Sequence, residues 1–90
     1  MKKVMLLTLA AMVASPAVAK TDKFCDVKAG SKWISLQKAR QIASAAGYSK
    51  IRMGMEAGCF EAEAEKGGQD YEVYIHPVSG KIVKIRKDID

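Results

Sequence analysis

"YEVYIHPVSGKIVKI", residues Tyr71 to Ile85, decides the fold of this 90-residue chain. It consists of two runs in which apolar and polar residues alternate, separated by the segment Pro77–Gly80. A two-residue period is typical of a strand with one buried face, whereas Pro, Ser and Gly favour turns. The stretch therefore predicts a β-hairpin whose second strand extends from Lys81 to Arg86.

The same period occurs twice upstream of the hairpin. Apolar residues alternate with others from Ile51 to Glu56, and again with Glu from Phe60 to Glu65. Ala57-Gly58 and the Gly-rich residues 66–70 provide the breaks between the runs. Loops this short join strands that are neighbours in a sheet, so we expect an antiparallel meander of four strands.

A helical period precedes the strands, in the segment SLQKARQIASAAG from Ser35 to Gly47. Ser is a common helix N-cap, and Gly is a common stop signal. Arg40 belongs to the polar face, which we assign to solvent. The apolar residues at helical spacing are Leu36, Ala39, Ile42, Ala43 and Ala46. The predicted class is α+β, with one N-terminal amphipathic helix packed on a four-stranded antiparallel sheet that ends in a β-hairpin.

The first 19 residues have the pattern of a cleavable secretory signal peptide. Lys2 and Lys3 form a basic start, an apolar run extends from Val4 to Ala14, and Ala17–Ala19 supplies the small residues of a cleavage site. The apolar run is well short of the roughly 20 residues that span a bilayer, so no membrane anchor is expected. The prediction is a single domain, residues 20–90, in a bacterial periplasm or secreted.

Both cysteines, Cys25 and Cys59, belong to the predicted mature domain. In an oxidising compartment, an even pair in a short chain is most simply a disulfide. A bridge that closes a loop of this length is worth about 3 to 4 kcal/mol in the chain-entropy account. The spacing differs from that of a Cys-x-x-Cys redox pair, and a single His is too few to complete a zinc site. We therefore predict a structural disulfide.

The segment from Trp33 to Arg86 resembles the PepSY family, whose small helix-plus-sheet domains also occur in the propeptides of thermolysin-type metallopeptidases. The resemblance rests on Gly47-Tyr48 at the end of the helix, on the segment Gly58–Glu61 that begins "GCFEAEAE", and on the terminal hairpin. These are mostly turn and core positions, so they indicate the fold more than an activity. Many members have Asp before the hairpin Pro, where this chain has His76.

The resemblance implies a non-catalytic module that binds or restrains a peptidase, or that senses something in the envelope. It implies no cofactor. The residues themselves also give little support to catalysis, since His76 is the only imidazole and Ser79 is its nearest hydroxyl in the turn. Nucleophilic or acid–base catalysis needs further orienting groups, and the sequence indicates none around this pair. We assign no catalytic residue and expect no enzyme activity.

Glu61, Glu63 and Glu65 share one face of the strand predicted from Phe60 to Glu65. Paired carboxylates occur in hydrolases and in hard-cation sites. The simpler interpretation is cross-strand charge pairing with Lys84 and Arg86, at roughly 0.2 to 1 kcal/mol for each pair. No metal site is predicted from these acids.

Met53 and Met55 are two residues apart and therefore share a face of one strand. Thioether sulfur is a ligand for Cu(I), so a small periplasmic copper-binding protein is an alternative function. Methionine also fills gaps in hydrophobic cores, and this face is expected to meet the helix. Packing is the preferred interpretation.

The basic charge gives little support to nucleic-acid binding. Removal of the signal peptide would lower the formal net charge from +5 to +3, because that segment carries two Lys and no acid. The remaining Lys and Arg are scattered, and no nucleic-acid-binding motif is present. A polyanion-binding envelope protein stays as a further alternative, through basic residues of the last strand such as Lys81 and Lys84.

The last strand is also a candidate edge strand, which could pair with an extended segment of another protein. Tyr74 and His76 alternate onto the face opposite Tyr71, and with Lys81 and Lys84 they are the predicted partner-binding residues. The sequence therefore predicts a periplasmic, non-catalytic binding module with a protein partner, such as a peptidase or an envelope sensor. Inhibition of a peptidase is the specific hypothesis.

Overall fold

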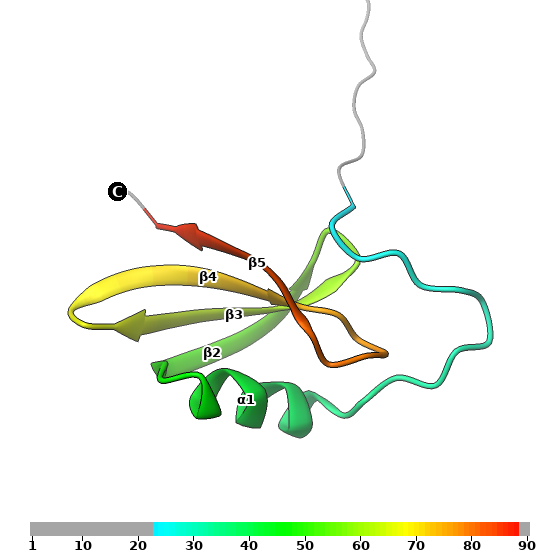
Figure 1. Cartoon of the computed structure of the whole chain (residues 1–90), viewed down its shortest axis with the longest axis horizontal. Helices are drawn as coiled ribbons and strands as arrows, with labels where there is room; N and C mark the ends of the chain where they lie inside the picture. The colour runs from blue at the N-terminus through cyan, green and yellow to red at the C-terminus, as the bar shows by residue number, and fades with distance from the viewer. Residues whose placement is uncertain (1–22, 89–90) are drawn as a thin grey trace, which may run out of the picture.

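A computed structural model describes residues 23–88 of the chain. It contains one helix, α1 (Leu36–Ala45), followed by four strands, β2 (Ser49–Glu56), β3 (Cys59–Lys66), β4 (Gln69–Ile75) and β5 (Ile82–Lys87) (Figure 1). The predicted signal peptide, residues 1–19, lies outside the described residues. The strands form one antiparallel sheet in the order β2-β3-β4-β5, so the predicted α+β class and the meander are confirmed.

The helix does not begin the described chain, which corrects its predicted N-terminal place. An irregular segment, residues 23–35, precedes it and runs around one end of the sheet (Figure 1). Phe24 N–H donates to Ala57 O at 2.9 Å, and Ile34 N–H donates to Pro77 O at 2.8 Å. The backbone of this segment is thus tied to two separate turns, which holds it away from helical geometry at both ends.

Two of the three strand connections are the tightest that a hairpin allows. Ala57 and Gly58 have φ angles of 56° and 81°, and Gly67 and Gly68 have φ angles of 60° and 79°. Positive φ at both central residues defines a type I′ turn, whose twist matches that of the flanking strands. The predicted break at residues 66–70 is therefore shorter than expected, because β3 continues to Lys66 and β4 begins at Gln69.

Helix α1 begins and ends where its sequence signals indicate. The Ser35 hydroxyl oxygen accepts a hydrogen bond from Lys38 N–H at 2.9 Å, and Gly47 follows the helix with a φ of 100°. The helix covers one face of the sheet, where the fully buried Ala39 and Ala43 allow a close approach. The rest of this core consists of Tyr48, between α1 and β2, and of buried residues of β3 and β4: Phe60, Ala62, Ala64, Val73 and Ile75. Leu36, expected on the buried face, is 50% exposed at the first turn.

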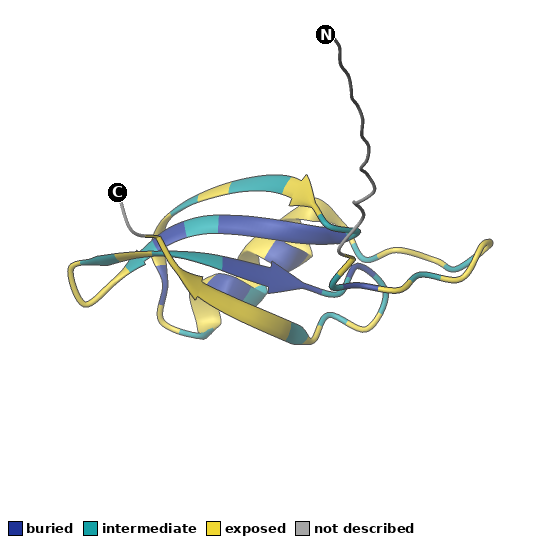
Figure 2. Ribbon diagram, turned by 90° about the horizontal axis from the view of Figure 1, so that it is seen from above, coloured by how far each residue is buried: buried dark blue, intermediate teal, exposed yellow. Residues whose placement is uncertain are grey.

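A second, smaller core lies on the opposite face of the sheet. It consists of Cys25, Cys59 and Tyr74, with Phe24 packed against them. The predicted disulfide joins Cys25 to Cys59 across 34 positions of the sequence and fastens the irregular segment to β3. Burial is accordingly concentrated on the two central strands, whereas β5 is largely exposed (Figure 2).

Candidate functional site

Strand β5 lies at an edge of the sheet and has β4 as its only neighbour among the described strands. Asp88 N–H donates to Asp70 O at 2.9 Å, so these two residues form a hydrogen-bonded pair. In an antiparallel ladder such pairs alternate with pairs that are not hydrogen-bonded. Ile85 and Lys87 therefore direct their N–H and C=O groups away from β4. We call this strand, Ile82–Lys87, the open edge.

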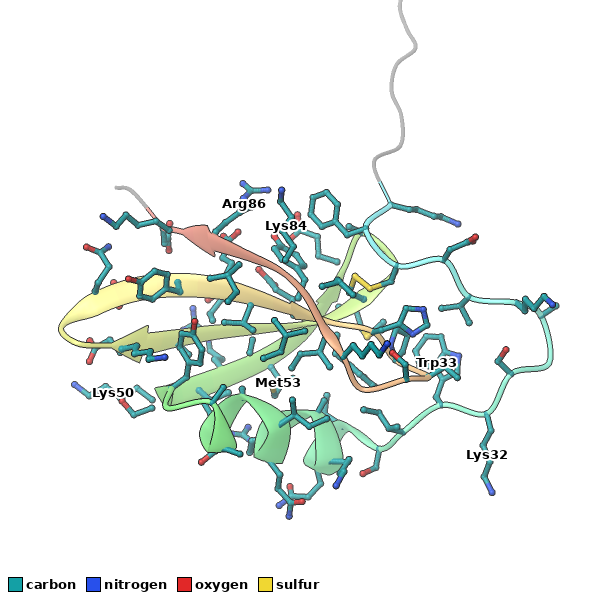
Figure 3. The ribbon with its side chains drawn as sticks, in the orientation of Figure 1. Lys32, Trp33, Lys50, Met53, Lys84 and Arg86 are labelled. Atoms are coloured by element: carbon teal, nitrogen blue, oxygen red, sulfur yellow. A yellow bond between two sulfur atoms is a disulfide. The ribbon has the colours of Figure 1, made fainter. Side chains whose placement is uncertain are left out.

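The side chains of the open edge combine apolar and basic character. Val83 and Ile85 are 42% and 49% exposed. Lys84 and Arg86 project from the sheet face opposite the helix (Figure 3). The strand IVKIRK contains no acidic residue. An exposed row of unpaired backbone groups with apolar side chains is the usual template for pairing with another chain.

Two interactions hold the basic side chains of the open edge. Arg86 Nε lies 3.6 Å from Glu72 Oε1 on β4. Lys84 Nζ stands 5.0 Å from the centroid of the Phe24 ring, within the range of a cation–π contact. Both residues remain exposed, so these contacts orient the charges without removing them from solvent.

The opposite edge of the sheet, β2, is obstructed. Arg40 of α1 donates from Nη1 to the carbonyl oxygen of Ile51 at 2.9 Å. The register shifts between Ser49 and Arg52, and Lys50 within this bulge has a φ of 52°. A bulge and a covering side chain are two of the means by which proteins protect strand edges. Assigning Arg40 to solvent alone was therefore wrong.

Tyr74 is placed differently from the other predicted partner-binding residues. Its side chain is fully buried, with the Phe24 ring edge-on at a centroid distance of 4.9 Å. The Tyr74 hydroxyl donates to Glu72 Oε1 at 2.9 Å. Burial, followed by this hydrogen bond, raises the pKa of the Tyr74 phenol. The predicted alternation onto this face is correct, but the irregular segment covers the ring, so Tyr74 offers no surface to a partner.

His76 organises the turn between β4 and β5. Its Nδ1 accepts hydrogen bonds from Val78 N–H at 3.1 Å and Ser79 N–H at 3.3 Å. Its Nε2 lies 3.0 Å from Asp26 O, which fits a neutral ring that donates from Nε2. A side-chain acceptor that bonds the N–H groups two and three positions ahead is the role of Asp in an Asx turn. His76 thus supplies the acceptor that Asp would supply.

Lys81 follows the same turn and is exposed. Its N–H donates to Ser79 Oγ at 3.2 Å, and its carbonyl oxygen accepts from His76 N–H at 2.8 Å. These bonds occupy the Lys81 backbone while the side chain reaches solvent. Ser79 Oγ therefore accepts a hydrogen bond within the turn. Ser79 contacts the His76 ring through its own backbone N–H.

The three glutamates of β3 have different partners from those predicted. Glu63 pairs with Arg52, and Glu65 Oε1 lies 3.5 Å from Lys50 Nζ. Both bases belong to β2. Pairing with Lys84 or Arg86 was wrong, because β4 lies between β3 and β5 and its Glu72 takes Arg86.

Glu61 is the exception in this row, since it is only 7% exposed. Burial is the largest cause that raises the pKa of the Glu61 carboxyl, and the negative charges of Glu56, Glu63 and Glu72 add to it. The part of the chain that the structure describes contains no acid, His or Cys cluster suited to a metal ion.

Met53 and Met55 are divided between core and surface. Met53 is partly buried and packs against the main core, whereas Met55 is 49% exposed at the end of β2. Met55 stands opposite Phe60, whose ring meets Trp33 edge-on at a centroid distance of 5.8 Å. Trp33 is itself 48% exposed and lies beside the hairpin turn (Figure 3). The sequence predicts no contact for Trp33 beyond its place at the start of the PepSY-like segment, because a periodic pattern does not connect an irregular segment to a strand.

A family model described as "Peptidase propeptide and YPEB domain", PepSY_2, matches residues 3–86. The chain belongs to this PepSY family. The resemblance drawn from the helix end, the segment Gly58–Glu61 and the hairpin is thereby confirmed. Neither the curated proteins nor the solved structures include a match to the chain. Helix α1, the one helix of residues 23–88, lacks the length and apolar character needed to cross a bilayer.

Proposed function

We propose that this PepSY chain is an exported, non-catalytic module that binds a protein partner and restrains a peptidase. The observation that carries the proposal is the open edge, which combines unpaired backbone, exposed apolar side chains and positive charge. Such a surface is suited to contact with another chain. Membership of a family that includes peptidase propeptide domains supports a peptidase as the partner.

The surroundings of the single imidazole favour binding over chemistry. Both ring nitrogens of His76 are engaged with backbone groups, which leaves neither free to take a proton from a nucleophile. The adjacent hydroxyl, Ser79 Oγ, accepts from Lys81 N–H. The role of these groups in the proposed module is to shape the turn that begins the open edge.

The predicted signal peptide, residues 1–19, and the disulfide support the proposed export. Cys25 and Cys59 are both buried, and disulfides of this kind persist in oxidising compartments. We place the module in a bacterial periplasm or outside the cell. The partner-binding residues in this proposal are those of the exposed hairpin, above all Lys81 and Lys84.

Capture followed by inhibition tests the proposal. The oxidised protein, purified after export of the full chain, is immobilised and exposed to envelope extract at low and moderate salt. A peptidase that is retained at moderate salt is then assayed with increasing amounts of the free protein. Loss of peptidase activity at stoichiometric amounts is the expected result. Retention that vanishes at moderate salt would instead indicate polyanion binding, and retention without inhibition would remove the restraining role.

A further inference from the structure

We infer that the open edge binds an extended segment of its partner in which acidic residues alternate with apolar ones, added as a fifth strand of the sheet. This inference rests on the proposed function and specifies the chemistry of the segment that is bound. Three features support it: the direction of the backbone groups of β5, the sorting of its side chains, and the obstruction of β2.

The ladder between β4 and β5 has a register shift between Ile82 and Lys84, and from Lys84 to Lys87 the backbone of β5 is regular and can pair with a further strand. Lys84 and Arg86 stand opposite Tyr74 and Glu72, in the same phase of the ladder as the bonded pair Asp70–Asp88. Their N–H and C=O groups are therefore directed at β4. The groups of Ile85 and Lys87 are directed outward, so an added strand gains hydrogen bonds without breaking any within the sheet.

The side chains of β5 specify what the added strand must carry. Lys84 and Arg86 lie on the face opposite the helix, and Ile85, opposite Val73, lies on the helix side. Residues directly across an antiparallel pair contact one another, and opposite charges stabilise such a pair. The complementary strand therefore presents acids to Lys84 and Arg86 and an apolar side chain to Ile85. That is an alternation of acidic and apolar residues.

Charge argues against a second copy of this chain as the occupant. Antiparallel pairing of two β5 strands about Ile85 would place Lys84 directly opposite Arg86 of the second copy. Like charges in directly opposed positions destabilise a sheet. The strand carries no acid that could relieve this repulsion. An acidic segment from a different protein avoids it.

The other edge of the sheet cannot serve in the same way. The Ile51 carbonyl oxygen already accepts from Arg40, and the bulge at Lys50 interrupts the regular spacing of β2. Strand addition is therefore expected at one edge, which fixes where the partner lies.

Amide exchange with defined peptide probes tests the inference. The first probe is a short peptide in which Glu alternates with Val. The second has the same composition with its Glu residues in one block, and the third is the alternating peptide with N-methyl groups along one edge. With the first probe, the N–H groups of Ile85 and Lys87 are expected to become protected from exchange, whereas those of Lys84 and Arg86, already directed at β4, change little.

Two variants of the exported, oxidised protein separate backbone pairing from charge. Ile85→Pro removes an outward N–H, and Pro is tolerated at such edge positions. It should abolish binding of the alternating peptide, while Ile85→Thr, which keeps the N–H, should bind it. Lys84→Gln with Arg86→Gln should weaken binding roughly 2- to 30-fold, the range that two cross-strand charge pairs supply. The matched control, Lys32→Gln with Lys38→Gln, removes equal charge elsewhere and should bind as the original does.

Three results would overturn the inference. Equal affinity for the alternating and blocked peptides, or for polyglutamate, would show attraction by charge alone. A dimer by sedimentation, lost in Ile85→Pro, would show that a second copy occupies the edge. No binding of the alternating peptide would reject the acidic strand. The proposed function is judged separately, since a peptidase captured equally well by Ile85→Pro would show a partner bound at another surface.

Discussion

The carbonyl oxygen of Cys25 lies 2.6 Å from the position that a Cβ atom on Gly58 would occupy. Gly58 also has a φ of 81°, in the region that L-residues with side chains adopt at a cost. One glycine therefore both closes the β2–β3 turn and admits the irregular segment to the face of the sheet. The disulfide of Cys25 and the cover over Tyr74 depend on that close approach.

Gly58→Ala is therefore expected to destabilise the protein by more than the conformational cost alone, which is about 1 to 2 kcal/mol for left-handed backbone. The added methyl group must displace the Cys25 backbone. The matched control is Gly67→Ala, where φ is 60° and nothing lies within 4 Å of the new Cβ atom. Urea unfolding measures the free energy of unfolding of both variants. Equal losses for the two variants would show that the contact with Cys25 contributes nothing.

Removal of the disulfide by Cys25→Ser with Cys59→Ser should lower the free energy of unfolding by about 3 to 4 kcal/mol, because the bridge closes a loop of 34 positions. It should also release Phe24 from Tyr74, which a loss of near-UV circular dichroism would report. The oxidised parent under the same conditions is the control. An unchanged unfolding midpoint would contradict the role assigned to the bridge.

His76→Asp tests whether the imidazole replaces an Asx-turn carboxylate. Aspartate can accept from the N–H groups of Val78 and Ser79, whereas His76→Ala leaves both without their acceptor. The Ala variant also loses the bond to Asp26 O, so at about 1 kcal/mol for each of three hydrogen bonds we expect it to lose about 3 kcal/mol and the Asp variant clearly less. The Asp variant still loses the bond to Asp26 O. Thermal unfolding ranks the three proteins, and equal losses in both variants would contradict the proposed equivalence.

Local sequence signals predicted most of the fold. The cap at Ser35, the stop at Gly47 and the Gly-containing turns each act within a few residues, and their elements appear where they were expected. The contacts that residues of the candidate site make within the chain were predicted poorly. Burial of Tyr74 depends on Phe24, fifty positions away, and protection of the Ile51 carbonyl depends on Arg40 of the helix. Neither contact can be predicted from the periodicity of the sequence, because both depend on where the irregular segment and the helix pack against the sheet.

The unfavourable charge on Glu61 gives the protein a defined response to pH. Because the pKa of the Glu61 carboxyl is raised in the folded state, the folded state binds the proton more tightly than the unfolded chain does. The resulting stabilisation is complete below the carboxyl's ordinary pKa and is lost as pH rises through the raised value. At neutral pH, the ionised Glu61 therefore destabilises the fold.

Glu61→Gln should consequently raise the free energy of unfolding at neutral pH, and this advantage over the parent should shrink as the pH falls. Glu65→Gln, which removes a carboxylate from the same strand at an exposed ion pair, is the control and should change stability by less than about 1 kcal/mol. Urea unfolding across an acid-to-neutral series provides the measurement. A Glu61→Gln variant that is less stable than the parent at neutral pH would mean that the buried carboxylate is stabilised by the bases around it.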